Sequence, residues 1–329
     1  MSFLRDHAST DFKPAVIEAS SVGCTARSRL KEGEKGTVQG VFDSAINIIF
    51  DKGLVSLVAA NVENGPFNVT LKLPDGISTI SSLRVSDGDK VSVKDSALKL
   101  NDMVFSFSSA GTYFPKQKFT APILTIHELE ANLQAAINTA VCYGNRAGLG
   151  ELFNIIKRKK GELMLEHLNI FANAAVGRII RLQQTLRLGE KSGLADAVKD
   201  LIGLGPGLTP SSDDMLAGLV LVCVLYAKNS GRKERVSRLL TEVIKEEVQG
   251  RTTIISEEFL KQAALGNGNE PAMKLCEALL TGGQSSVEKE VKHGLAIGDS
   301  SGTDMVLGMI LGMMFCMDKP SGLEMRGST

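Results

Sequence analysis

The sequence predicts an α+β protein: an N-terminal antiparallel β sandwich or barrel followed by a mainly α-helical C-terminal domain. In the first third, short runs rich in β-branched residues alternate with turn-forming residues, a pattern typical of small all-β domains. From residue 127 onward, apolar residues recur instead with helical spacing. The pattern changes near residues 115–122, so we expect a β-rich domain over residues 1–120 and an α-helical domain over residues 121–329.

The individual elements follow from the same two patterns. The strands expected in the first domain cover residues 38–42, 45–50, 55–58, 67–71, 90–94, 98–100 and 104–107. Clusters of Gly, Pro, Asn and Asp, such as residues 63–66 and 87–89, supply the turns between them. The helices expected in the second domain cover residues 128–141, 163–188, 193–201, 211–227, 233–247, 256–265, 272–280, 286–295 and 303–317, and a further helix starts at residue 149.

Composition limits the classes of function. The 329 residues carry 37 Lys and Arg against 37 Asp and Glu, so the formal net charge is zero. That balance gives no support for general binding to nucleic acid or to an anionic membrane. Five scattered cysteines without C-x-x-C spacing indicate reduced thiols rather than disulfides or a zinc site. The apolar runs at residues 215–227 and 305–317 are shorter than the roughly 20 residues that cross a bilayer, and no targeting signal is visible, so we expect a cytoplasmic protein.

Residues 203–214 form the first candidate site, because they place three glycines and two prolines directly before a strongly apolar helix. Thr209 suits the N-cap position and Pro210 the first helical position. Gly205 and Gly207 permit backbone conformations closed to other residues and let a ligand approach closely. Exposed amides at a helix start attract phosphate or carboxylate, so we expect an anion here. The segment is neither a Walker A loop, since no Gly-Lys-Ser/Thr follows, nor a Rossmann fingerprint, since a helix rather than a strand is expected before it.

A second apolar helix begins with a similar motif, because residues 211–218 and 301–308 share the pattern Ser-x-x-Asp-Met-x-x-Gly. The glycine one turn after each Asp would let the two helices pack closely, with Asp214 and Asp304 opposed across one pocket. Such a pocket suits an anion held by backbone amides, or a divalent cation that bridges carboxylates to a phosphate. The alternative is two similar helix caps, with Asp213 and Asp214 only complementing the helix dipole.

These motifs supply the candidate site residues. Asp213, Asp214 and Asp304 are the catalytic candidates, and Asp214 and Asp304 are also candidate metal ligands. Arg251 could hold a carboxylate or phosphate bidentately, although a plain helix connector is equally consistent with its segment. The candidate substrate-binding residues are Gly205, Gly207, Thr209, Ser211, Ser212, Arg251, Thr252, Ser301, Gly302 and Thr303. The sequence requires no cofactor, and Mg²⁺ remains open as one.

The pattern Gly-Leu-Gly-Pro-Gly-Leu-Thr-Pro-Ser-Ser-Asp-Asp at residues 203–214, with Ser-Ser-Gly-Thr-Asp-Met at residues 300–305, resembles a bacterial family long known only as a domain of unknown function. That family includes one subunit of oxamate carbamoyltransferase, an enzyme of anaerobic allantoin degradation, and some members are labelled carboxylase-related. Ser212 stands where the family pattern has Gly. Residues 40–47 with the later Gly-Pro at residues 65–66 are also similar to the family, as is the Arg-Thr-Thr segment that starts at residue 251.

The resemblance implies a subunit of a cytoplasmic carbamoyltransferase that acts in purine catabolism. Such an enzyme moves a carbamoyl group between oxalurate and phosphate, giving oxamate and carbamoyl phosphate. The implied partners are a small anionic substrate or phosphate and the other subunits of the complex. Nucleic acid and membrane are not expected, and a homo-oligomer stays open. Two alternatives remain: a non-catalytic ligand-binding or scaffold subunit, and a Mg²⁺-dependent hydrolase with paired Asp at helix starts.

Overall fold

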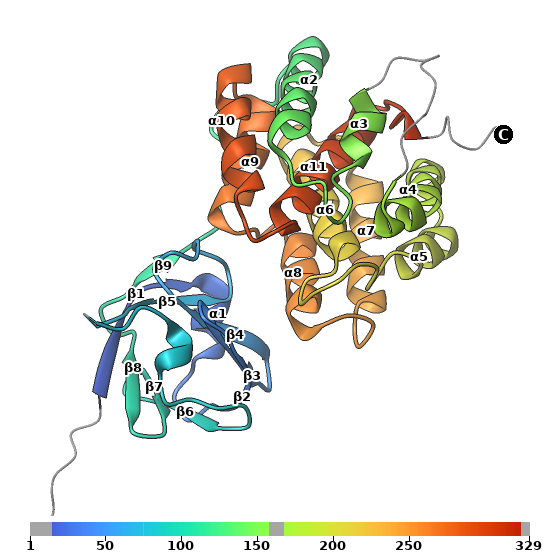
Figure 1. Cartoon of the computed structure of the whole chain (residues 1–329). Helices are drawn as coiled ribbons and strands as arrows, with labels where there is room; N and C mark the ends of the chain where they lie inside the picture. The colour runs from blue at the N-terminus through green and yellow to red at the C-terminus, as the bar shows by residue number, and fades with distance from the viewer. Residues whose placement is uncertain (1–14, 75, 158–167, 324–329) are drawn as a thin grey trace, which may run out of the picture. The chain divides into compact units, whose positions relative to one another are not determined.

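The computed structural model describes residues 15–74, 76–157 and 168–323. Contacts between residues divide the chain into two compact units, Met1–Phe114 and Pro115–Thr329 (Figure 1). The first unit is built from strands and the second from helices. Each unit is described by itself below.

The first unit is a closed β barrel. Its strands in the described residues are β1 (Ala15–Gly23), β2 (Lys35–Val41), β3 (Ala45–Phe50), β4 (Gly53–Val58), β5 (Asn68–Lys72), β6 (Lys90–Lys94), β7 (Ala97–Leu100), β8 (Met103–Ser106) and β9 (Gly111–Tyr113), with the short helices α1 (Cys24–Arg29) and η1 (Ile80–Ser82). The strand order is β5-β4-β3-β2-β6-β7-β8-β1, and the pairing of β1 with β5 closes the barrel. This confirms the expected α+β class, with a barrel rather than a sandwich.

The strand directions differ in part from the expectation of an antiparallel sheet. Most neighbours are antiparallel, but β1 pairs in parallel with β8 and β9, and β4 pairs in parallel with β5. The strand that closes the barrel, β1, was not among the strands expected from the sequence. Its alternation of apolar and polar residues is interrupted by Ser20 and Ser21, where the pairing with β5 shifts register after Ala19.

Apolar side chains fill the barrel interior, among them the fully buried Ile46 and Leu98. At the start of α1, the backbone amides of Thr25 and Ala26 both donate to the carbonyl oxygen of Pro66, at 2.9 and 3.0 Å. The Gly-Pro pair at residues 65–66 therefore satisfies two of the free amides that every helix start leaves.

The second unit is helical. Its helices in the described residues are α2 (Ile126–Tyr143), α3 (Leu152–Lys157), α4 (Ile170–Leu188), α5 (Lys191–Lys199), α6 (Ser211–Ser230), α7 (Glu234–Glu247), α8 (Ile254–Leu265), α9 (Glu270–Thr281), α10 (Gln284–Leu295) and α11 (Ser301–Cys316). The first five residues of the helix expected over residues 163–188 lie outside the described residues. Later in the chain, α4 begins at Ile170. The Asn169 side chain caps this helix by accepting from the amides of Phe171 and Ala172, each at 2.9 Å.

The start of α6 differs from the expectation that Thr209 caps the helix and Pro210 opens it. Pro210 occupies the N-cap position and Ser211 is the first helical residue. The loop over residues 203–210, called the glycine loop below, explains the difference. A Cβ atom at Gly205 would overlap the backbone nitrogen of Ser211. The loop therefore packs directly against the first turn of α6, and the Thr209 hydroxyl is directed to another helix instead, as described below.

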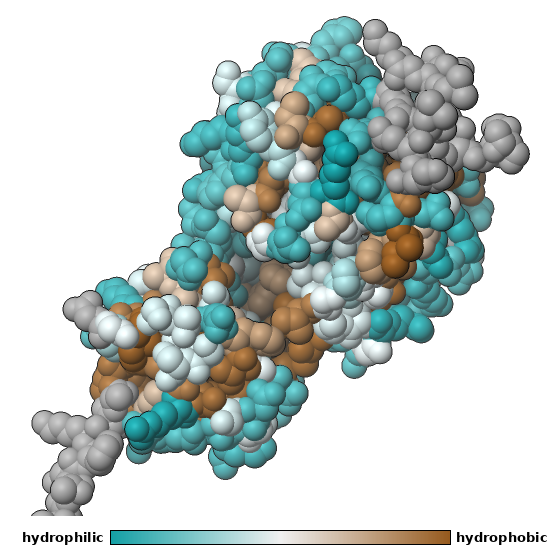
Figure 2. Space-filling view, viewed as in Figure 1, coloured by the Kyte–Doolittle hydropathy of each residue, from teal (hydrophilic) through white to brown (hydrophobic). Residues whose placement is uncertain are grey.

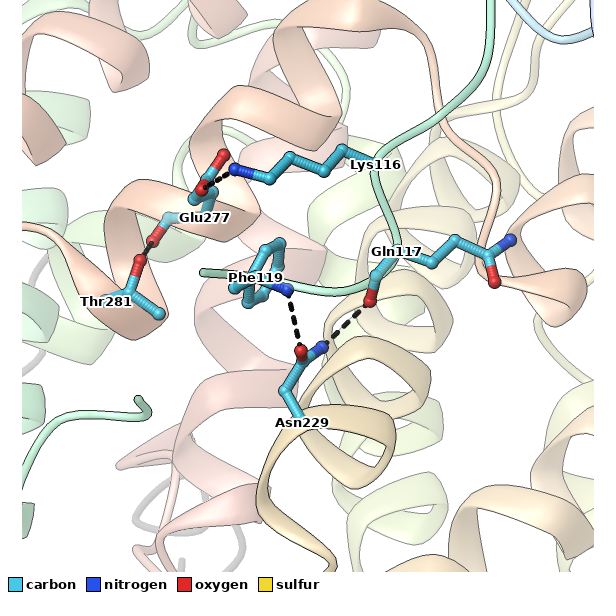
Figure 3. Close-up of polar contacts among 6 residues, drawn as sticks. All are labelled: Lys116, Gln117, Phe119, Asn229, Glu277 and Thr281. Carbon is cyan, nitrogen blue, oxygen red and sulfur yellow. Dashed lines mark hydrogen bonds and ion pairs between the residues drawn. The ribbon is translucent and has the colours of Figure 1, made fainter. Parts of the chain in front are cut away.

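Hydrogen bonds fix the segment that leads into the helical unit (Figure 3). The Asn229 side chain accepts from the amide of Phe119 at 2.9 Å and donates to the carbonyl of Gln117 at 3.0 Å. Lys116 forms an ion pair with Glu277 on α9, with 2.7 Å between Nζ and Oε1. The Gln117 side chain in turn donates to the side chain of Asn267, which follows α8. The segment thus braces the turn between α8 and α9.

Apolar residues of the helical unit lie mainly inside. The face of this unit seen in Figure 2 is largely hydrophilic, while the side chains of α6 and α11 are almost all buried. Within the described part of the chain, no helix combines the length and the apolar character needed to cross a membrane. All five cysteines are free thiols.

The two buried helices α6 and α11 pack with their backbones in contact. A Cβ atom at Gly218 would overlap the carbonyl oxygen of Met305, and one at Gly308 would overlap the carbonyl oxygen of Met215. These four positions correspond in the repeated Ser-x-x-Asp-Met-x-x-Gly pattern, so a local two-fold relation links the helix starts. The close approach that the sequence predicted for the two glycines is therefore confirmed.

We predict that Gly308→Ala lowers the free energy of unfolding by about 3 kcal/mol, because the added methyl group forces the two backbones apart. Gly177→Ala on α4 is the matched control, since a Cβ atom there meets nothing within 4 Å. It should raise stability by about 0.5–1 kcal/mol, the helix-propensity difference. Urea denaturation followed by circular dichroism measures both. Equal effects of the two variants would contradict the glycine contact.

Candidate functional site

Asp213 ties the glycine loop to the segment before α8. Its side chain is 1% exposed, and Oδ1 accepts from the amide of Gly203 at 2.8 Å. The hydroxyl of Thr252 donates to Oδ2. Burial raises the pKa of the Asp213 carboxyl, and these two hydrogen bonds oppose the rise. Both oxygens are thus occupied within the chain, and Asp213 and Thr252 hold the loop in place.

Ser212 also has a structural role. Its side chain is fully buried, and its hydroxyl lies within hydrogen-bond distance of the carbonyl oxygens of Leu201, just after α5, and of Leu204 in the glycine loop. The Ser212 amide donates to the same Leu204 oxygen at 3.0 Å. The residue that replaces the glycine of the family pattern therefore fastens the loop to α5.

Asp214 sits one residue further along α6 in a different environment. The hydroxyls of Thr209 and Ser301 lie 2.8 Å apart and join the N-terminal ends of α6 and α11. Burial raises the pKa of the Asp214 carboxyl well above its ordinary value, the two hydroxyls oppose the rise, and the nearby Asp304 adds to it. Among the described residues, Oδ2 of Asp214 has no hydrogen-bond partner, and the same holds for Oδ2 of Asp304. Asp214 is therefore held toward its neutral, protonated form with one oxygen unused.

Asp304 lies at the equivalent position of α11 and is fully buried. Its Oδ1 accepts from the backbone amide of Leu149 at 2.8 Å. Burial raises the pKa of this carboxyl to about 7, against the opposing hydrogen bonds of the Leu149 amide and the hydroxyls of Ser211 and Ser300. Gly148 adopts a φ of +59°, and a Cβ atom there would lie 2.5 Å from Oδ2 of Asp304. The Gly148–Leu149 turn thus covers the Asp304 carboxyl closely.

The two carboxyls are related by the local two-fold. Ser211 of the first motif interacts with Asp304 of the second, and Ser301 of the second interacts with Asp214 of the first. The surroundings then differ, because the Leu149 amide occupies the place beside Asp304. Beside Asp214 the chain leaves a cavity instead.

The cavity has a volume of about 240 Å³ and lies between α6, α8, the start of α9 and the start of α11. In the part of the chain that the structure describes, no lysine or arginine lines it. The Oδ1 atom of Asn267 accepts from Gln117, and that of Asn269 accepts from the amide of Ala272. The residues that line the cavity are Thr209, Asp214, Ala217, Gly218, Leu221, Phe259, Ala263, Asn267, Gly268, Asn269, Ala272, Ile297, Gly298, Ser301 and Met305.

Of the sequence candidates, the structure brings Thr209, Asp214 and Ser301 together at this cavity and places the others elsewhere. Gly207 is exposed with a φ of +88°, whereas Gly302 packs against the end of α10. The remaining candidates are engaged inside the chain: Gly205 against Ser211, Ser211 beside Asp304, Ser212 and Thr252 in the hydrogen bonds above, and Thr303 accepting from the Asn145 amide.

Arg251 and the helix-start amides bear on the expected anion site. Arg251 is exposed, and its Nε lies 3.7 Å from Oε2 of Glu247. It does not line the cavity. The amides of Ser212 and Gly302, near the starts of α6 and α11, donate to the carbonyl oxygens of Leu204 and Ile297. These two amides are satisfied within the chain.

A Mg²⁺ ion needs ionised oxygen ligands. The two carboxyls proposed for it are the ones whose pKa is raised by burial. Across residues 15–74, 76–157 and 168–323, no group of three or more His, Cys, Asp and Glu residues is placed to hold a metal ion. Burial thus holds both carboxyls toward the neutral form, in which each is a hydrogen-bond donor as well as an acceptor.

Sequence reasoning missed the Gly148–Leu149 turn and the apolar wall from α8 and α9. Leu149 contributes through its backbone amide, which carries no sequence signature. Ala263 and Ala272 are buried alanines of the kind found in any helix core. A recurrence of small residues on α6, α8 and α9 was the one signal that could have indicated a slot between these helices.

We predict that the Asp304 carboxyl makes stability fall as pH rises. It titrates near 3.8 when unfolded and at about 7 in the fold. Between these pH values the folded state holds the proton and the unfolded state does not. The contribution of this carboxyl to the free energy of unfolding is therefore complete below about pH 4 and declines up to about pH 7. Asp304→Asn mimics the neutral acid and should reduce this decline by about 2–4 kcal/mol. Urea denaturation of both proteins at several pH values gives the two slopes, and identical slopes would refute the assignment.

Comparison with known families agrees with the two-part organisation. The model described as oxamate carbamoyltransferase subunit AllH matches residues 201–313, which hold both Asp-containing motifs. The model of the AllH family N-terminal domain matches residues 18–112, which form the barrel. No solved structure matches the chain. Since the two models together cover more than half of its residues, the chain belongs to the AllH family, named for a subunit of oxamate carbamoyltransferase.

Proposed function

We propose that this chain supplies a substrate-binding site of an oxamate carbamoyltransferase, and that the cavity beside Asp214 holds the carbamoyl group. The single observation that carries the proposal is the Asp214 carboxyl, which lines the cavity, is held toward its neutral form, and has one buried oxygen without a hydrogen-bond partner among the described residues. A neutral carboxyl offers one O–H donor and further acceptor capacity. The C=O and N–H₂ of a carbamoyl group match this pair.

The Asp304 side of the site supports the same chemistry. There the chain places an amide N–H, that of Leu149, 2.8 Å from the corresponding carboxyl. Because the two motifs are related by a local two-fold, the cavity beside Asp214 is the place where a ligand amide would take the position of Leu149. A carbamoyl N–H fits that position, and an anion does not.

The transfer itself requires a proton. A phosphate oxygen attacks the carbamoyl carbon of oxalurate, the bond from that carbon to the oxamate nitrogen breaks, and the nitrogen takes up a proton as oxamate leaves with carbamoyl phosphate as the second product. A carboxyl whose pKa is raised by burial is suited to donate that proton. The hydroxyls of Thr209 and Ser301 orient it. Since no cationic side chain of the described residues lines the cavity, other subunits would neutralise the phosphate and the oxamate carboxylate.

The lack of a cation among the residues that line the cavity also favours a second candidate function. The chain would then bind the neutral end of the substrate while another subunit performs the transfer. This candidate predicts a change in KM without a change in kcat when Asp214 is altered.

We predict that Asp214→Asn in the assembled enzyme lowers kcat for oxalurate cleavage by about 100-fold or more and changes KM by less than about fivefold. The reason is that Asn still pairs with an amide but cannot donate a proton to the leaving nitrogen. Steady-state rates of phosphate-dependent carbamoyl phosphate formation measure both constants. Asp213→Asn is the matched control, because the carboxyl of Asp213 is bonded to Gly203 and Thr252 within the chain. This variant should lower the free energy of unfolding and leave kcat nearly unchanged. Unchanged kcat in an intact Asp214→Asn complex would overturn the catalytic proposal.

A further inference from the structure

The cavity is longer than a carbamoyl group. Asp214, Gly218 and Leu221 line it along successive turns of α6. A helix rises about 1.5 Å per residue, so this wall extends for about 10 Å beyond the carboxyl. The carbamoyl group fills only the end beside Asp214.

The rest of the cavity is apolar. Leu221 of α6, Phe259 and Ala263 of α8, and Ala272 of α9 form its walls. The side-chain oxygens of the two asparagines at its edge are already bonded within the chain. No charged side chain of the described residues lines this part of the wall, so a charged group placed there would lose its hydration without gaining an ion pair, and an apolar group is favoured.

We propose that the cavity binds amides and ureas that carry an aliphatic substituent, with the amide at Asp214 and the substituent along α6 between α8 and α9. The inference rests on the proposed function for the position of the amide end. It extends the ligand class from small polar amides to those with about four substituent carbons, which match the length of the apolar wall.

The same geometry disfavours aliphatic ligands of equal length that place a carboxylate, instead of an amide, beside Asp214. A carboxylate placed beside Asp214 would lose its hydration without gaining a cation, because none lines the cavity in the described residues. A neutral urea instead gains hydrogen bonds to the carboxyl and buries its chain. Pentanoate and N-butylurea, which carry the same four-carbon chain, are therefore a discriminating pair of probes.

The experiment is a calorimetric titration of the full-length chain with N-methylurea, N-propylurea, N-butylurea and pentanoate. Each added methylene should tighten binding by about fourfold, so N-butylurea should bind about 60-fold more tightly than N-methylurea. Ala263→Leu fills the apolar part of the cavity and should abolish this gain while N-methylurea still binds. Ala264→Leu is the matched control, since the next residue of α8 is also buried but lines a different groove, and it should keep the gain. Ala217→Leu, which enters the cavity from α6, replaces Ala263→Leu if that variant does not fold.

Affinity that does not depend on chain length would overturn the inference, and so would a chain-length gain that survives Ala263→Leu or Ala217→Leu. Binding of pentanoate as tightly as N-butylurea would also overturn it. The proposed function is judged separately, by whether N-methylurea binding is lost in Asp214→Ala. If Asp214→Ala abolishes N-methylurea binding but longer chains do not bind more tightly to the unaltered chain, the carbamoyl site is supported and the apolar part of the site is refuted.

Discussion

The contact of α6 and α11 at their glycines is the constraint on which the site depends. Because Gly218 and Gly308 lie against the backbone of the opposite helix, the two N-terminal ends are held side by side. This brings Ser301 to Asp214, and Ser211 to Asp304. Any side chain at either glycine would separate the helices and pull both serine–aspartate pairs apart.

Burial of these carboxyls then decides what the site can do. Two ionised carboxylates at neighbouring helix starts would suit a cation, but here desolvation is the largest cause of the raised pKa at both Asp214 and Asp304. Neutral carboxyls serve as paired donors and acceptors instead. The turn at Leu149 donates to one oxygen of Asp304, whereas Asp214 lines the cavity. A pair of similar motifs thus yields one structural carboxyl and one that faces a cavity.

The sequence predicted much of this arrangement and missed the rest for identifiable reasons. The repeated Ser-x-x-Asp-Met-x-x-Gly pattern was sufficient to predict the glycine contact, because close packing has a direct residue signature. Asp213 and Asp214 could not be separated by sequence, since their opposite environments depend on Thr252 and on α11. Closure of the barrel by β1 depends on long-range pairing, and the cavity wall consists of alanines and larger apolar residues of the kind found in any helix core; neither leaves a local signal.

The protonation state of Asp214 is the most direct test of this account. The carboxyl carbon resonances of the full-length chain, labelled with ¹³C-aspartate and assigned with Asp214→Asn and Asp304→Asn, report it at each pH. The account predicts that Asp214 keeps the resonance of a protonated carboxyl well above its ordinary pKa of 3.8, and that N-methylurea shifts this resonance while leaving Asp304 nearly unchanged. A fully ionised Asp214 at pH 5 that does not respond to N-methylurea would contradict it.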